Sequence, residues 1–188
     1  MLDIPFEEKK QALINYIQYG IDCYGMLKQG KTWGPGGGHR PGMLLPLAFT
    51  AVMLGDEDMK ERVSAHEEIY EDKIVRYSEA ADYGRGEVIY GGVSSAKSYW
   101  GSLVTKGGNR SIADPYGIID GSYNMPGSYQ YCCTSQPLKG SVLAVYLMPE
   151  LRPVYNCDKI LQYIDRWVAS GTWAQPDPCA PPDGIIEG

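Results

Sequence analysis

The chain has few of the residues that metal sites and disulfide scaffolds need. Its 188 residues include two histidines, His39 and His66, and five cysteines without a C-x-x-C pair. Structural zinc sites and dense disulfide frameworks depend on closely spaced cysteine and histidine residues, so neither is indicated. We expect no bound metal and no cofactor, and the cysteine pattern leaves the redox compartment open.

Long apolar runs and clusters of positive charge are also missing. The longest apolar run covers residues 43–54, whereas a membrane-spanning helix needs about 20 residues. We recognise no secretory signal pattern at the start of the chain. Acidic and basic residues are interspersed, with a formal net charge of −6, and phosphate binding needs clustered lysine and arginine. We therefore expect neither a membrane nor a nucleic acid as partner, and we leave the oligomeric state open.

Tyrosine is abundant instead. The chain has 15 tyrosines and four tryptophans against two phenylalanines. Tyrosine and tryptophan rings combine an apolar face with a polar tip. Such rings are typical of sugar-binding clefts, and they are equally typical of tyrosines that lie half-buried at helix edges, so the composition alone leaves both interpretations open.

The first third of the chain carries three helical patterns. Residues 4–30 have apolar positions three and four apart and predict an amphipathic helix that ends near Gly30. Residues 43–54 are apolar on nearly every face and predict a fully buried helix that Gly55 ends. A charged helix follows around residues 57–70, and Asp56 is its expected N-cap.

The rest of the chain predicts a small hairpin and more helices. Short apolar runs on either side of a glycine-containing turn predict a β-hairpin around residues 73–90, and a short helix is expected around 95–104. Residues 136–148 form a second strongly apolar helix, with proline in its first turn. An amphipathic helix over 157–169 follows, with one expected apolar face, and the proline-rich residues 174–188 are expected to be extended. That face comprises Ile160, Leu161, Ile164, Trp167 and Val168.

Amphipathic helices thus alternate with helices that have no polar face. An outer layer of amphipathic helices around an inner apolar layer is typical of α/α toroids and solenoids. We expect a mainly all-α chain: one helical domain over residues 1–188, forming a partial α/α toroid of helical hairpins and a fragment of a larger toroid. Inner helices would then begin at one rim, which would bring the loops 33–42 and 122–135 together.

Three segments carry a resemblance to a known group of proteins. They are Gly-Gly-Gly-His-Arg-Pro-Gly at 36–42, Tyr-Gln-Tyr-Cys-Cys-Thr-Ser at 129–135 and Tyr-Ile-Asp-Arg-Trp at 163–167. Over about residues 5–170 the chain resembles the α/α-toroid proteins of carbohydrate metabolism, which include alginate-lyase-like and heparinase II/III-like catalytic domains. The resemblance implies a polysaccharide lyase that cleaves an acidic, uronate-containing glycan by β-elimination. It also implies a secreted or periplasmic location.

The resemblance and the loop chemistry together suggest a set of site residues. Members of the group commonly use His and Tyr for β-elimination and Asn, Arg or His to neutralise the uronate carboxylate. On this chain His39 and Tyr131 would act as base or acid. Arg40, beside a helix N-terminus that itself favours anions, would neutralise the carboxylate. The expected substrate-binding residues are Trp33, Asn124 and Tyr129.

Other interpretations of these residues stay open. His39 can equally cap a helix or bond a loop carbonyl, and Tyr129 and Tyr131 can be structural because tyrosine is so common here. Cys132 and Cys133 can supply a thiolate beside a helix N-terminus, although a buried, inert pair is the simpler case. Asp165 and Arg166 are expected to form a structural ion pair rather than to act in catalysis.

Two alternative functions follow from the same pattern. The first is a non-catalytic helical scaffold whose aromatic rim binds a glycan or a protein. The second is a glycoside hydrolase on the same fold, which needs two carboxylates on either side of the scissile bond. Asp114, Asp120 and Glu87 are the candidates for that pair.

Overall fold

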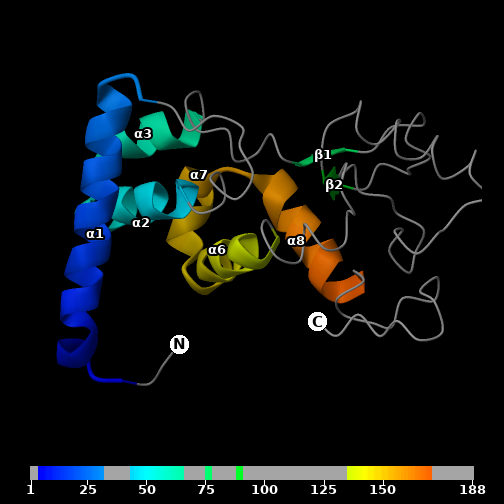
Figure 1. Cartoon of the computed structure of the whole chain (residues 1–188), viewed down its shortest axis with the longest axis horizontal. Coiled ribbons are helices and arrows are strands. Elements are labelled where there is room, and N and C mark those ends of the chain that lie inside the picture. Colours follow the sequence, from blue (N-terminus) through cyan, green and yellow to red (C-terminus); the bar gives the residue numbers. More distant parts are fainter. Residues whose placement is uncertain (1–3, 32–42, 66–74, 78–87, 91–134, 171–188) are drawn as a thin grey trace, which may run out of the picture. The chain divides into compact units, whose positions relative to one another are not determined.

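The computed structural model describes residues 4–31, 43–65, 75–77, 88–90 and 135–170. Contacts divide the chain into two compact units, the first made of residues 1–71 and 143–156 and the second of residues 72–142 and 157–188. The described elements are mainly helices (Figure 1), which confirms the expected fold class. The toroid and the single domain over 1–188 stay predictions.

The first unit is built around one short apolar helix. Helix α2 contacts four other elements of this unit, which places it at the centre (Figure 1). The elements are α1 (Phe6–Lys28), α2 (Leu44–Leu54), α3 (Glu57–Ala65), the 3-10 helix η5 (Pro149–Leu151) and α7 (Arg152–Tyr155). The helices predicted over 4–30 and 43–54 are confirmed, and the charged helix after Asp56 is confirmed up to residue 65.

Glycine ends both α1 and α2, as the sequence predicts. Gly30 has a φ of 79° and Gly55 a φ of 63°, a left-handed conformation that costs glycine little. The N–H groups of each glycine and of the residue after it donate back to carbonyls in the last turn of the helix, in the pattern of a Schellman motif. These bonds run from Gly30 to Leu27 (2.9 Å), Lys31 to Met26 (3.0 Å), Gly55 to Val52 (3.2 Å) and Asp56 to Ala51 (3.1 Å).

Asp56 is the N-cap of α3. Its Oδ1 atom accepts a hydrogen bond from the backbone N–H of Met59 at 2.9 Å, as expected from the sequence. Glu57 and Asp58 then place two carboxylates in the first turn of α3, where the helix dipole favours negative charge. The connection from α2 to α3 is therefore only Gly55 and Asp56, and both residues are held by hydrogen bonds.

Helices α1 and α2 approach each other closely at Gly20. This residue is buried, and Thr50 on α2 donates a hydrogen bond from its Oγ1 to the carbonyl of Ile17 at 3.4 Å. A Cβ atom added to Gly20 would lie 2.0 Å from the Thr50 Oγ1 and 2.6 Å from the carbonyl oxygen of Pro46. The two helices can cross at this distance only because residue 20 has no side chain.

The prediction that α2 is buried on every face is wrong at its end. Six of its residues are buried, from Leu44 to Ala51. Met53 and Leu54 in the last turn are 43% and 52% exposed. The buried positions end at Ala51, so the last turn extends past the packed part of the helix. An apolar sequence therefore predicts the central position of α2 correctly but overstates its burial.

The second unit joins a small hairpin to a helix. Strands β1 (Val75–Tyr77) and β2 (Val88–Tyr90) pair antiparallel, with Arg76 opposite Ile89, and this confirms the predicted hairpin. Both strands contact α8 (Asp158–Ser170). Val75 and Val88 are buried, and Arg166 donates from Nε to the carbonyl of Val88 at 3.0 Å. This bond fixes β2 to the helix.

Helix α8 shows the predicted apolar face with one exception. Ile160, Leu161, Ile164 and Trp167 are buried, but Val168 is 41% exposed. Tyr163, which we did not include in the predicted apolar face, is fully buried and widens that face. Four of the five predicted positions are therefore confirmed, and Val168 is a correction.

Helix α6 (Ser135–Leu147) begins in the second unit and ends in the first, and it confirms the helix predicted over 136–148. It is less buried than its composition suggests. Leu138, Val142 and Val145 are buried, whereas the large apolar residues Leu143, Tyr146 and Leu147 are about half exposed. These three are spaced at i, i+3 and i+4 and so lie on one face. The expectation of a helix without an exposed face is wrong for α6.

Several predictions lie outside the described residues. They include the helix over 95–104, the final residues of the helix over 57–70, and the extended segment 174–188. Among the helices that the structure does describe, none is both long enough and apolar enough to span a membrane.

The packing at Gly20 makes a testable prediction. We expect Gly20→Ala to lower the free energy of unfolding by about 1–3 kcal/mol, because the backbone carbonyl of Pro46 must move to admit the methyl group. Gly25→Ala is the matched control in the same helix, since a Cβ there meets nothing within 4 Å. The control should stabilise the protein by roughly 0.5–1 kcal/mol. Urea denaturation measures both, and equal effects of the two variants would contradict the close approach.

Candidate functional site

The residues that the sequence nominates for chemistry lie outside the described part of the chain. They are His39, Arg40, Trp33, Asn124, Tyr129 and Tyr131, together with the alternative carboxylates Asp114, Asp120 and Glu87 and the pair Cys132 and Cys133. Their roles stay predictions. The described residues give the helices next to these segments and one groove elsewhere in the first unit.

Two described helices begin directly after the nominated loops. Helix α2 begins at Leu44, behind the loop that carries His39 and Arg40, and α6 begins at Ser135, four residues after Tyr131. The N-cap of α2 is Met43, which makes no side-chain capping bond, and its first turn contains no acidic residue. The positive end of the α2 dipole therefore has no carboxylate from that turn beside it.

Tyr19 holds the start of α2 against α1. Its hydroxyl donates a hydrogen bond to the sulfur of Met43 at 3.6 Å. Partial burial raises the pKa of Tyr19, and the neighbouring Cys23 raises it further. Burial also raises the pKa of the Cys23 thiol, although its hydrogen bond with Tyr19 acts in the opposite direction. Cys23 is thus a buried thiol that stays protonated near neutral pH, and it is unsuited to act as a nucleophile.

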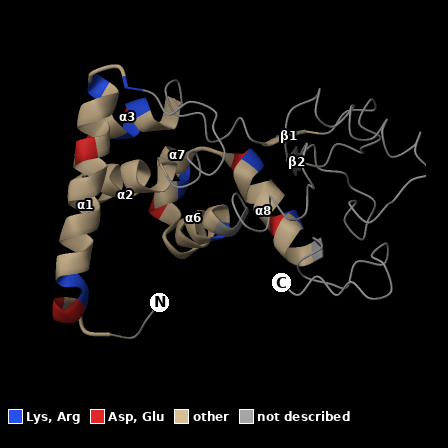
Figure 2. Ribbon diagram, in the orientation of Figure 1, with Lys and Arg blue, Asp and Glu red and all other residues tan. Residues whose placement is uncertain are grey.

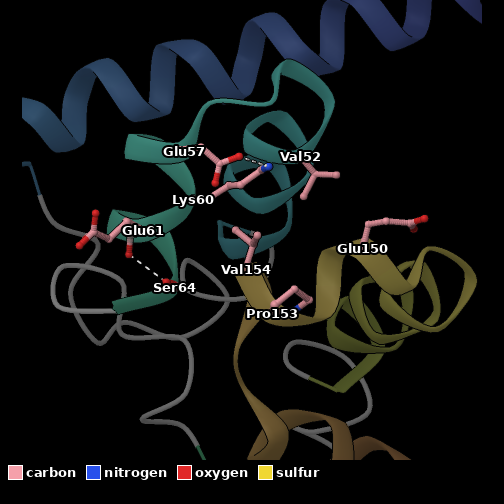
Figure 3. Close-up of a pocket in the computed structure, with 8 residues that line it drawn as sticks. All are labelled: Val52, Glu57, Lys60, Glu61, Ser64, Glu150, Pro153 and Val154. Atoms are coloured by element: carbon pink, nitrogen blue, oxygen red, sulfur yellow. Dashed lines mark hydrogen bonds and ion pairs between the residues drawn. The ribbon is translucent and has the colours of Figure 1, made fainter.

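The first unit contains a groove of about 590 Å³ between α3 and α7 (Figure 3). Four residues of α3 form one side, and η5 and α7 form the other. The lining residues are Val52, Glu57, Lys60, Glu61, Ser64, Glu150, Pro153 and Val154. Asn156, in a left-handed conformation with a φ of 41°, donates from Nδ2 to the carbonyl of Ser64 at 3.0 Å and joins the two sides.

Charge is unevenly distributed in the groove. Lys60 Nζ lies 2.7 Å from a carboxylate oxygen of Glu57. The carboxylates of Glu61 and Glu150 stand at opposite ends of the groove and point away from Val154 (Figure 3). Along the described helices as a whole, blue and red residues are interspersed (Figure 2). An acidic groove of this kind would repel the carboxylates of a uronate polymer.

The described groove does not have the geometry of a metal or hydrolase site. Within the described ranges, no group of three or more His, Cys, Asp or Glu side chains is placed to hold a metal ion. A glycosidase needs two carboxylates facing one bond, whereas Glu61 and Glu150 point apart (Figure 3).

Of the two charged residues of α8 that we considered structural, Arg166 contacts structural partners. Arg166 bonds the carbonyl of Val88, and its guanidinium carbon lies 5.4 Å from the centre of the Tyr163 ring. Lys139 of α6 similarly lies over Trp167, with Nζ 5.5 Å from the ring centre. Burial lowers the pKa of Lys139. Both cations stack on buried rings of α8, as cation–π pairs do; the ion pair expected between Asp165 and Arg166 stays a prediction.

Comparisons of the chain with protein families, with curated proteins and with solved structures find no match. The resemblance to α/α-toroid carbohydrate-active proteins is therefore neither supported nor opposed by a relative.

Sequence reasoning did not find the groove. Glu57 and Glu61 are four residues apart on α3, a spacing that places them on one helix face, but nothing in the sequence joins them to Glu150. The two sides are about ninety residues apart in the sequence, and the packing of α2, α3 and α7 brings them together.

The raised pKa values of Cys23 and Tyr19 predict how stability depends on pH. As the pH rises past the unfolded-chain pKa values, about 8.5 for cysteine and about 10 for tyrosine, the unfolded chain releases these protons before the folded protein does, so the free energy of unfolding should fall. Cys23→Ala should make this fall shallower between about pH 7 and pH 10 in urea denaturation. Met53→Leu, at an exposed and non-ionising position, should leave the slope unchanged. A Cys23→Ala slope equal to that of the parent protein would refute the role of burial.

Proposed function

We propose that the chain is a carbohydrate-processing helical domain, most specifically a polysaccharide lyase that cleaves an acidic, uronate-containing glycan. The supporting observation is where two helices begin. Both apolar helices start directly behind the segments that carry His39, Arg40 and Tyr131. A loop that precedes a helix N-terminus brings backbone N–H groups and positive dipole to the bound group, which suits a carboxylate.

The proposed reaction needs no cofactor. Arg40 and the N-terminus of α2 neutralise the uronate carboxylate, which acidifies the adjacent C–H bond. His39 or Tyr131 removes that proton as base, and the other protonates the leaving oxygen. As the C–H electron pair forms a C=C bond, the C–O bond to the next sugar breaks, so atoms and charge balance. Trp33, Tyr129 and Asn124 hold the sugar rings, and a secreted or periplasmic location accords with such a substrate.

Product chemistry tests this proposal. Incubation with alginate or polygalacturonate should give the ultraviolet absorbance of an unsaturated uronate. His39→Ala and Tyr131→Phe should each lower the rate by about 10²–10⁴-fold, as expected for loss of a general acid or base. Gln11→Ala, on the exposed side of α1, is the control and should retain the parent rate.

Two results would separate the alternatives. Reducing ends that appear without the absorbance, and disappear in Asp114→Asn or Asp120→Asn, would overturn the lyase in favour of the glycoside hydrolase. If no acidic glycan is cleaved, the lyase proposal fails, and the non-catalytic scaffold becomes the better interpretation. The groove of the first unit specifically favours this scaffold, since among the described residues it is an open, partly apolar surface without facing catalytic groups.

A further inference from the structure

The apolar part of the groove's lining is aliphatic. It consists of Val52 of α2 and of Pro153 and Val154 on the α7 side (Figure 3), and we call these three residues the floor. None of the eight lining residues has an aromatic ring. Sugar-binding surfaces rely on the apolar faces of tyrosine and tryptophan rings, so this floor is poorly suited to a glycan. It is suited to alkyl groups.

Negative charge surrounds this floor. Three glutamates and one lysine line the groove, which leaves two formal negative charges. The Lys60 ammonium is already paired with Glu57. Within the described residues, the carboxylates of Glu61 and Glu150 have no ion pair, and Ser64 donates its bond to the backbone carbonyl of Glu61 rather than to the side chain. Both carboxylates are thus available to a cation that arrives from solvent.

An alkyl chain that ends in a positive charge matches both features. Lysine and arginine side chains lay their methylene stems along apolar surface while the charged end stays in contact with water or with a carboxylate. Because Glu61 and Glu150 stand at opposite ends of the floor, one segment needs two such side chains to contact both. The volume of about 590 Å³ is within the range of roughly 300–1,000 Å³ found for ligand pockets. The same carboxylates would repel an anionic glycan or a nucleic acid.

We propose that this groove is a docking site for a short segment of a protein partner that bears two lysine or arginine residues among apolar ones. The segment packs its apolar groups and methylene stems on Val52, Pro153 and Val154. Its charged ends contact Glu61 and Glu150. The proposal uses none of the residues assigned to the lyase reaction, and either can fail without the other.

Peptide titration of the full chain tests the site. The probe is an end-blocked hexapeptide of alternating leucine and lysine, and calorimetry and backbone amide NMR shifts measure its binding. We expect shifts centred on Val52, Glu61 and Val154, and affinity that falls with added salt. The double variant Glu61→Gln, Glu150→Gln should weaken binding about fivefold, as expected for two solvent-exposed charge pairs. Val52→Thr should also weaken binding, because it replaces an apolar group of the floor by a hydroxyl.

A matched control separates docking from general attraction between opposite charges. The double variant Glu7→Gln, Glu8→Gln changes the net charge by the same amount at exposed positions of α1 outside the groove, and it should bind as the parent does. Replacing the three peptide lysines by acetyl-lysine removes the same charge pairs from the peptide side, so it should weaken binding at least as much as the Glu61→Gln, Glu150→Gln variant does. The proposal would be overturned if the two double variants bind the peptide with equal affinity, or if the acetylated peptide binds as well as the parent peptide. The absence of shifts at the lining amides would overturn it too.

Discussion

The first unit depends on how closely α1 and α2 can approach. A backbone carbonyl and a threonine hydroxyl of α2 occupy the space where a side chain at position 20 would stand. Because Thr50 then reaches the carbonyl of Ile17, the polar group that this contact buries is also satisfied. Near this crossing, Tyr16 and Phe49 pack edge to face with ring centres 5.4 Å apart. The crossing of α1 and α2 therefore depends on the missing side chain at Gly20, which leaves room for the Thr50 side chain and the Pro46 carbonyl.

Side chains that donate hydrogen bonds to carbonyls at helix ends hold the remaining elements around that crossing. Arg62 of α3 donates to the carbonyl of Leu27 in the last turn of α1, at 3.0 Å. Asn156 does the same for Ser64 near the end of α3. The last carbonyls of a helix lack partners within it, and a cation there also complements the dipole. The unit is therefore joined by contacts that satisfy helix ends as well as by its apolar packing.

Local signals in the sequence predicted the elements well, whereas signals that depend on packing were misleading. Gly30, Gly55 and Asp56 end or begin helices through their own backbone and side-chain chemistry, so their positions could be predicted without knowledge of the fold. Gly20 acts through a neighbouring helix, and a glycine inside a helical pattern reads only as a weak helix former. The exposure of the last turn of α2 and of one face of α6 has the same origin, because apolar composition does not state what lies alongside a helix. The acidic groove likewise joins residues far apart in the chain, and the nominated loops lie outside the described residues.

The two-residue connection between α2 and α3 has a consequence for how the groove could change. Because Gly55 and Asp56 are both fixed by hydrogen bonds, the end of α2 determines how α3 is rotated about its own axis. Each residue of an α-helix turns the direction of its side chains by about 100°. Adding a single residue to the connection would thus turn Glu57 and Glu61 together out of the groove wall while leaving every helix intact. The charge of the groove is therefore governed by the length of a turn that does not itself line the groove.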